Sequence, residues 1–122
     1  MQRILIIDDD EQVRTLLRDI LTFEGFSVIE AGDGAVGLKL YREQPTDLIM
    51  TDLIMPEKEG LETIMALRKE FPNVRIIAMS AGGSRGHSYL PTAKMLGAAQ
   101  TLSKPFLRQE AVDAVRKTLA AC

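Results

Sequence analysis

The sequence predicts a three-layer, doubly wound α/β domain built on a five-stranded parallel sheet. Two observations lead to this prediction. Short β-branched runs alternate five times with amphipathic segments, and the first run is apolar throughout, as in a strand that is buried on both faces. Parallel strands need crossover helices, and right-handed crossovers place these helices on both faces of one sheet. We expect the 122 residues to form one domain, 1–122.

The first half of the chain should hold three strands and two helices. The strands are expected at residues 3–7, 26–31 and 48–52. The first helix ends before Gly25, and its apolar side chains recur at helical spacing: Val13, Leu16, Leu17, Ile20 and Leu21. The second helix follows the turn Gly32-Asp33-Gly34, runs to about residue 43 and is closed by Pro45.

The second half continues the same alternation. Strands are expected at 74–80 and 101–103, and a short helix at about 89–96 follows a glycine-rich stretch. A third helix ends before Pro72 and is lined by Leu61, Ile64, Met65 and Leu67; a last helix is defined by Val112, Val115 and Leu119. Four methionines should fill the core: Met50, Met55, Met65 and Met79.

Composition excludes several classes of function. The formal net charge is −2 and no basic cluster is present, so we expect no direct nucleic-acid binding. No apolar stretch approaches the length of a membrane span. The single cysteine, Cys122, cannot form an internal disulfide, which suits a reducing cytoplasm.

Polar side chains follow four of the five predicted strands. In open α/β sheets the site lies beyond the carboxyl ends of the strands, where these residues should meet. The second strand ends in Ala31-Gly32, with nothing reactive. The others end in polar residues: Asp8, Asp9 and Asp10 for the first, Asp52 for the third, Ser80 for the fourth, and Ser103-Lys104-Pro105 for the fifth. Charged groups are rarely buried unless they are paired, so this convergence predicts a functional site.

The three carboxylates Asp8, Asp9 and Asp52 would repel one another, and a divalent cation resolves this conflict. Carboxylate oxygens with waters suit Mg²⁺. Asp10, in contrast, should only begin a solvated loop. A carboxylate can attack a phosphoryl group, to which Lys104 would offer a positive charge and Ser80 a hydroxyl donor.

These residues make the chain resemble the receiver domain of bacterial two-component response regulators over essentially its whole length. The matching stretches are residues 4–9 (ILIIDD), 47–56 (DLIMTDLIMP), Gly60, 76–81 (IIAMSA) and 103–106 (SKPF). The resemblance implies a flavodoxin-like strand order of 2-1-3-4-5 and a cis Lys104–Pro105 bond.

The resemblance also implies the roles of the site residues. Asp52 would accept a phosphoryl group from a histidine kinase phosphohistidine, a phosphotransfer protein or a small phosphodonor. Asp9, Asp52 and the backbone carbonyl of Ile54 would bind Mg²⁺ directly, and Asp8 mainly through water. Ser80 and Lys104 would bind the phosphoryl group.

The implied function is signalling, and the domain is not expected to be an enzyme. The domain would assist its own phosphorylation and dephosphorylation. The acyl phosphate would shift a two-state equilibrium, which the fourth helix, fifth strand and fifth helix present to a downstream protein. We expect a cytoplasmic monomer or weak dimer.

Three features depart from the family pattern. Thr101 stands where the family often has an aromatic switch residue, so output should use backbone movement alone. The loop after Ser80 is about two residues longer than usual and carries Gly82, Gly83 and Gly86. Ile54 cannot orient a water molecule by hydrogen bonding, so self-dephosphorylation should be slow.

The sequence allows four other interpretations. Gly32, Gly34 and Gly37 fit a dinucleotide-binding pattern, but they follow the second strand instead of the first. An aspartyl phosphatase would need a second acid at Ile54, and a flavodoxin-like electron carrier would need a Ser/Thr-rich loop after the first strand. A degenerate receiver that only binds partners remains the alternative. His87 has no histidine or cysteine partner and is expected to be a solvated loop residue.

Overall fold

The computed structural model describes residues 1–53, 59–81, 94 and 97–120. Five parallel strands form one sheet in the order β2-β1-β3-β4-β5, which confirms the expected order. The strands are β1 (Arg3–Ile7), β2 (Ser27–Ala31), β3 (Leu48–Asp52), β4 (Ile76–Ala81) and β5 (Gln100–Lys104). The second strand therefore begins one residue later than expected, and the fifth strand is longer at both ends.

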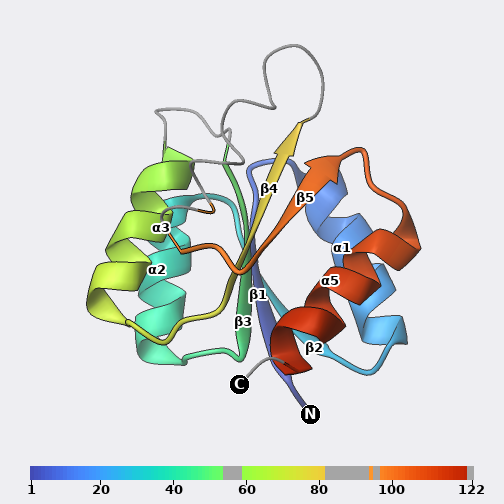
Figure 1. The fold of residues 1–122 in the computed structure, drawn as a ribbon, viewed down its shortest axis with the longest axis horizontal. Helices are drawn as coiled ribbons and strands as arrows, with labels where there is room; N and C mark the ends of the chain where they lie inside the picture. The colour runs from blue at the N-terminus through green and yellow to red at the C-terminus, as the bar shows by residue number, and fades with distance from the viewer. Residues whose placement is uncertain (54–58, 82–93, 95–96, 121–122) are drawn as a thin grey trace.

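Helices cover both faces of the sheet, as the doubly wound prediction requires (Figure 1). α1 (Glu11–Phe23) and α5 (Arg108–Ala120) lie on one face, and α2 (Gly34–Glu43) and α3 (Glu59–Glu70) lie on the other. Apart from residue 94, the expected helix at 89–96 lies outside the described residues, as do Met55, His87 and Cys122.

The alternation of side chains along β1 divides the core in two. Ile4 and Ile6 pack in the cluster beneath α1 and α5, whereas Leu5 and Ile7 pack in the cluster beneath α2 and α3. All four side chains are fully buried. Successive strand residues point to opposite faces, so an apolar run without alternation is what a doubly covered strand requires.

Two helices begin at aspartates whose side chains cap them. The Asp10 carboxylate accepts a hydrogen bond from the backbone N–H of Gln12, and Asp33 accepts one from Val36. Side-chain oxygens at this position satisfy N–H groups that the first helical turn leaves unpaired. Asp10 is thus a helix cap, consistent with the modest role expected for it. Gly25 follows α1 with a φ of +96°, which explains why this helix ends there.

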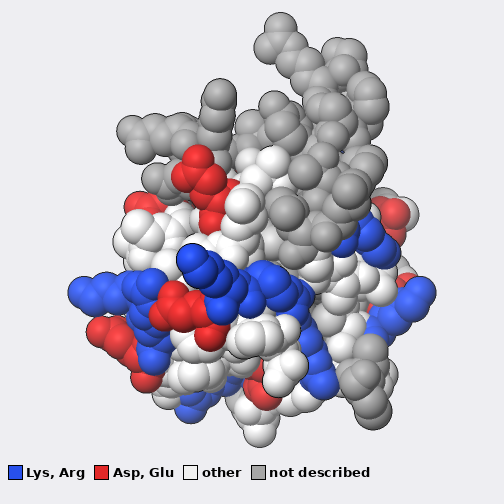
Figure 2. Space-filling model, turned by 60° about the vertical axis from the view of Figure 1, so that its left-hand side comes forward, with Lys and Arg blue, Asp and Glu red and all other residues white. Residues whose placement is uncertain are grey.

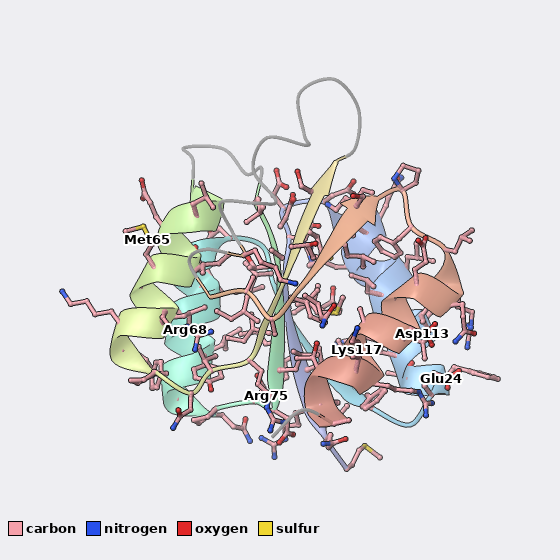
Figure 3. All side chains as sticks on the ribbon, viewed as in Figure 1. Glu24, Met65, Arg68, Arg75, Asp113 and Lys117 are labelled. Atoms are coloured by element: carbon pink, nitrogen blue, oxygen red, sulfur yellow. The ribbon has the colours of Figure 1, made fainter. Side chains whose placement is uncertain are left out.

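Other sequence-based expectations about these elements were wrong. Met65 was expected in the core, but it is 54% exposed and points away from the sheet (Figure 3). Leu16, which belongs to the apolar pattern of the first helix, is 50% exposed. The apolar stripes of these two helices are narrower than the pattern suggested. The fourth strand begins at Ile76 instead of Val74, because the N–H of Val74 bonds to the carbonyl of Phe71 in a turn and ladder pairing starts at Ile76. Met50 and Met79 are fully buried as expected.

Charged side chains of both signs lie side by side on the face turned forward in Figure 2. At the C-cap of α1, the Glu24 carboxylate pairs with Arg108 and Arg116 of α5 and so connects the two helices of one layer (Figure 3). The hydrogen bonds from these arginines lower the pKa of Glu24. Within the described residues, no helix is both long and apolar enough to span a bilayer.

Candidate functional site

The carboxyl ends of the parallel strands meet at one edge of the sheet, uppermost in Figure 1. Asp8 directly follows β1, and Asp52 is the last residue of β3, the neighbouring strand. The register pairs Ile7 with Thr51, so Asp8 and Asp52 occupy equivalent positions on adjacent strands. The predicted convergence of strand-end residues is therefore present.

Three carboxylates gather at this edge. Asp8, Asp9 and Asp52 each present a ligand oxygen, and these oxygens all lie within 4.8 Å of one another. Asp8 is fully buried, Asp52 is 5% exposed and Asp9 is exposed. One side of the cluster is therefore shielded by protein and the other is open to solvent. Hard oxygen donors in this arrangement suit a small divalent cation that keeps part of its water shell.

Lys104 reaches the cluster from β5. Its Nζ lies 2.6 Å from Oδ2 of Asp8 and 3.4 Å from Oδ2 of Asp52, and its side chain is 17% exposed. Burial by itself would lower the pKa of Lys104, but the hydrogen bond to Asp8 and the charges of Asp52 and Asp8 outweigh burial and raise it. Lys104 is therefore a fixed positive charge that neutralises part of the carboxylate cluster. The bond between Lys104 and Pro105 is cis, as expected.

Ser80 lies on β4, between β3, which carries Asp52, and β5, which carries Lys104. It follows Met79, which pairs in register with Asp52, and its own register partner on β5 is Ser103. The side chain is fully buried at the carboxyl end of β4. The backbone carbonyl of Ile54, which was expected to bind the cation, lies outside the described residues.

Asp8 is held at four atoms. Its N–H donates to the carbonyl of Ala31, and its Oδ1 accepts a hydrogen bond from the N–H of Asp10 at 2.9 Å. Its Oδ2 accepts from Lys104, and its backbone carbonyl accepts from Nη1 of Arg14 at 2.6 Å. Both carboxylate oxygens of Asp8 thus already have donors, whereas Asp9 is exposed.

Sequence reasoning missed two residues that support this edge, Arg14 and Glu30. Glu30 on β2 pairs with Nε of Arg14 at 3.2 Å and with Nε of Arg18 at 2.7 Å. The second strand was expected to end in no reactive residue, but it supplies an acid close to the site. A signal existed: a glutamate interrupts the apolar run of this strand, and arginines recur four residues apart on the preceding helix.

Two of the three glycines of the dinucleotide-like pattern have packing roles. A Cβ at Gly34 would overlap the side chain of Thr63 on α3, and one at Gly37 would overlap Ile7 on β1. These two glycines let α2 approach α3 and the sheet closely. Packing therefore accounts for Gly34 and Gly37 without a nucleotide.

The comparisons with known proteins agree with this geometry. A family model described as the response regulator receiver domain matches residues 4–116. The chain is 39% identical over 119 residues to the transcriptional regulatory protein CpxR of Escherichia coli (strain K12), an alignment that covers 98% of this chain and 50% of CpxR. It is 36% identical over 118 residues to the chemotaxis protein CheY of Bacillus subtilis (strain 168), covering 96% of this chain and 97% of CheY.

Solved structures share the fold. The crystal structure of a putative response regulator from Chloroflexus aurantiacus J-10-fl superposes with a TM-score of 0.91 at 28% identity, covering 98% of each chain. The chain spans half the length of the CpxR relatives that it matches and nearly the whole length of CheY.

Proposed function

The chain belongs to the response regulator receiver domain family, and on that premise we propose that Asp52 accepts a phosphoryl group at a Mg²⁺ site formed with Asp8 and Asp9. The observation that carries this proposal is the meeting of three carboxylate ligands and the Lys104 ammonium at one edge of the sheet. The donor set fits Mg²⁺, because it offers hard oxygens and an open side for water. When bound, the cation would neutralise charge on the carboxylates and on the incoming phosphoryl group.

The chemistry of the step follows from the positions of Asp52 and Lys104. A carboxylate oxygen of Asp52 attacks phosphorus and forms an acyl phosphate, while the bond from phosphorus to the donor breaks. With a phosphohistidine donor, the electron pair of that bond returns to the imidazole nitrogen; with acetyl phosphate, acetate leaves. Lys104 offsets the negative charge that develops on the phosphoryl oxygens, and Ser80 offers a hydroxyl donor.

Asp9 and Asp52 are the proposed direct ligands, together with the Ile54 carbonyl. Asp8 acts through water, and its two engaged carboxylate oxygens support this assignment. The proposed donor is a histidine kinase or a phosphotransfer protein, and the proposed reader of the phosphorylated state is a downstream protein. In this proposal the domain works in the cytoplasm and assists both its own phosphorylation and its own dephosphorylation.

Incubation with acetyl phosphate and Mg²⁺, followed by intact mass spectrometry, tests the proposal. We expect one added phosphoryl group, which is lost in Asp52→Asn and reduced by EDTA. Asp10→Asn is the matched control, because asparagine also caps helices and Asp10 lies outside the proposed ligand set. Failure of the unaltered protein to take up a phosphoryl group would favour the degenerate-receiver alternative.

A further inference from the structure

Arg14 on α1 contacts the carboxyl-end regions of two neighbouring strands, β1 and β2. Its Nη1 donates to the backbone carbonyl of Asp8 at 2.6 Å, and its Nε donates to Oε1 of Glu30 at 3.2 Å. The side chains of Arg14 and Glu30 are only 18% and 25% exposed. A shielded guanidinium that donates to two groups at once fixes geometry more firmly than an exposed ion pair does.

The carbonyl that Arg14 binds belongs to the peptide leading into Asp9. Sheet pairing of β1 with β3 ends at Ile7, so β3 does not fix the orientation of this peptide. Because a peptide unit is planar, holding the carbonyl oxygen of Asp8 also sets the direction of the N–H and Cα of Asp9. Asp9 is the exposed member of the carboxylate cluster, so we expect its position to follow from that of its backbone.

We propose that Arg14, oriented by Glu30, is a positioning residue that presents the carboxylates of Asp8 and Asp9 to the cation. This inference rests on the Mg²⁺ site proposed above. Groups that orient metal ligands from outside the coordination shell typically contribute about tenfold or more to metal affinity. Arg14 touches neither the cation nor the phosphoryl group in this account.

The direction in which Mg²⁺ affinity changes when Arg14 is removed distinguishes a positioning role from a purely electrostatic one. A positive charge near a cation site opposes cation binding, so an arginine acting only through its charge would weaken Mg²⁺ affinity, and its removal would strengthen it. A positioning residue has the opposite effect, since its removal lets the peptide before Asp9 rotate. Arg18 provides the matched control: it also pairs with Glu30, but its side chain is 48% exposed, and among the described residues its guanidinium pairs with Glu30 alone.

Titration of ¹⁵N-labelled protein with MgCl₂, followed by the amide shifts of residues 8–10, tests the proposal. We expect Arg14→Gln to bind Mg²⁺ about tenfold more weakly than wild type, and Arg18→Gln to bind it at least as tightly as wild type. Phosphorylation by acetyl phosphate should be slow in Arg14→Gln at low Mg²⁺ and recover at saturating Mg²⁺. Denaturant unfolding in EDTA verifies that each variant is folded.

Unchanged or tighter Mg²⁺ binding by a folded Arg14→Gln variant would overturn the proposal. If that variant does not fold, Arg14→Lys replaces it, because lysine keeps the charge but cannot reproduce the two-pronged contact; wild-type affinity would then be the contradicting result. A wild-type protein that binds no Mg²⁺ would remove the proposed function itself. Wild-type binding with an unaffected Arg14→Gln would remove only the role of Arg14.

Discussion

Lys104 and Asp8 form an ion pair of 2.6 Å across a separation of 96 residues, although β3 and β4 lie between their strands in the sheet. Asp8 is fully buried, so its charge is balanced within the protein instead of by solvent. The pair therefore ties the two ends of the chain together at the site, and it links fold stability to the charge state of the carboxylate cluster.

Removing the Lys104 ammonium should destabilise the folded protein but strengthen its binding of Mg²⁺. Lys104→Met leaves the carboxylates of Asp8 and Asp52 without their cationic partner, and we expect the free energy of unfolding in EDTA to fall by about 2–3 kcal/mol. Mg²⁺ should restore more stability in this variant than in wild type, because an uncompensated cluster attracts it more strongly. Denaturant unfolding with and without Mg²⁺ measures both effects. Lys117→Met, on the exposed side of α5, is the control (Figure 3); an equal loss in the control would contradict the prediction.

The stabilisation by Lys104 should depend on pH at the alkaline end. The pKa of Lys104 is raised above its ordinary value of 10.5 because its ion pairs outweigh its burial. A raised pKa means that the stabilising contribution is complete below the ordinary value and is lost as the pH rises through the higher, folded-state pKa. The stability difference between wild type and Lys104→Met should thus stay constant from pH 7 to about 9.5 and shrink above about 10.5. A difference that shrinks on acidification through neutral pH would be inconsistent with this assignment.

Gly60 should be intolerant of a side chain for a reason that concerns the site. A Cβ at this position would overlap the backbone of Leu53, the residue after Asp52. Because backbone cannot rotate away as a side chain can, Gly60→Ala should cost about 2 kcal/mol and slow phosphorylation of Asp52.

Gly25→Ala is the control that separates a loss of stability from a change in the phosphorylation rate. It should cost about 1 kcal/mol because of the positive φ, but nothing lies within 4 Å of the added methyl group. The phosphorylation rate of this control should match that of wild type. A Gly60→Ala variant that is phosphorylated at the wild-type rate would show that Leu53 can yield without moving Asp52.

The lifetime of the phosphorylated state should depend on residue 54, which lies outside the described residues. Ile54 is apolar and cannot orient an attacking water molecule, so we expect slow self-dephosphorylation. Ile54→Asn introduces an amide that can hydrogen-bond to water and should shorten the half-life of the phosphoryl group. The decay of intact phosphorylated mass after removal of the phosphodonor measures it, and equal lifetimes in the two proteins would refute this reasoning.

Much of the fold was predictable because it follows from local pattern. The residues of β1 and β3 were predicted to their exact ends, since each is a short, mainly apolar run with an acid at or directly after its carboxyl end. Met65 was misplaced because periodicity gives the direction of an apolar stripe more reliably than its width. The start of β4 was misjudged because a turn hydrogen bond at Val74 competes with the sheet, which hydropathy does not reveal.

The site was predictable in its members but not in its contacts. Strand-end position brings Asp8, Asp52 and Lys104 together, and topology alone suffices for that. Which acid is buried, and which pairs with Lys104, depends on side-chain packing across four strands. The contribution of Arg14 and Glu30 depends on a helix-to-strand contact between residues 16 apart, which the pattern of strand ends does not contain.

The most direct test of the account is chemical localisation of the phosphoryl group. Hydroxylamine converts an acyl phosphate to a hydroxamate, which peptide mass spectrometry can assign to one residue. After reaction with acetyl phosphate and Mg²⁺, we predict the hydroxamate on Asp52 alone, at a level that falls sharply when EDTA is present during phosphorylation. Labelling of Asp8 or Asp9, or labelling of Asp52 that is unchanged by EDTA, would contradict the account.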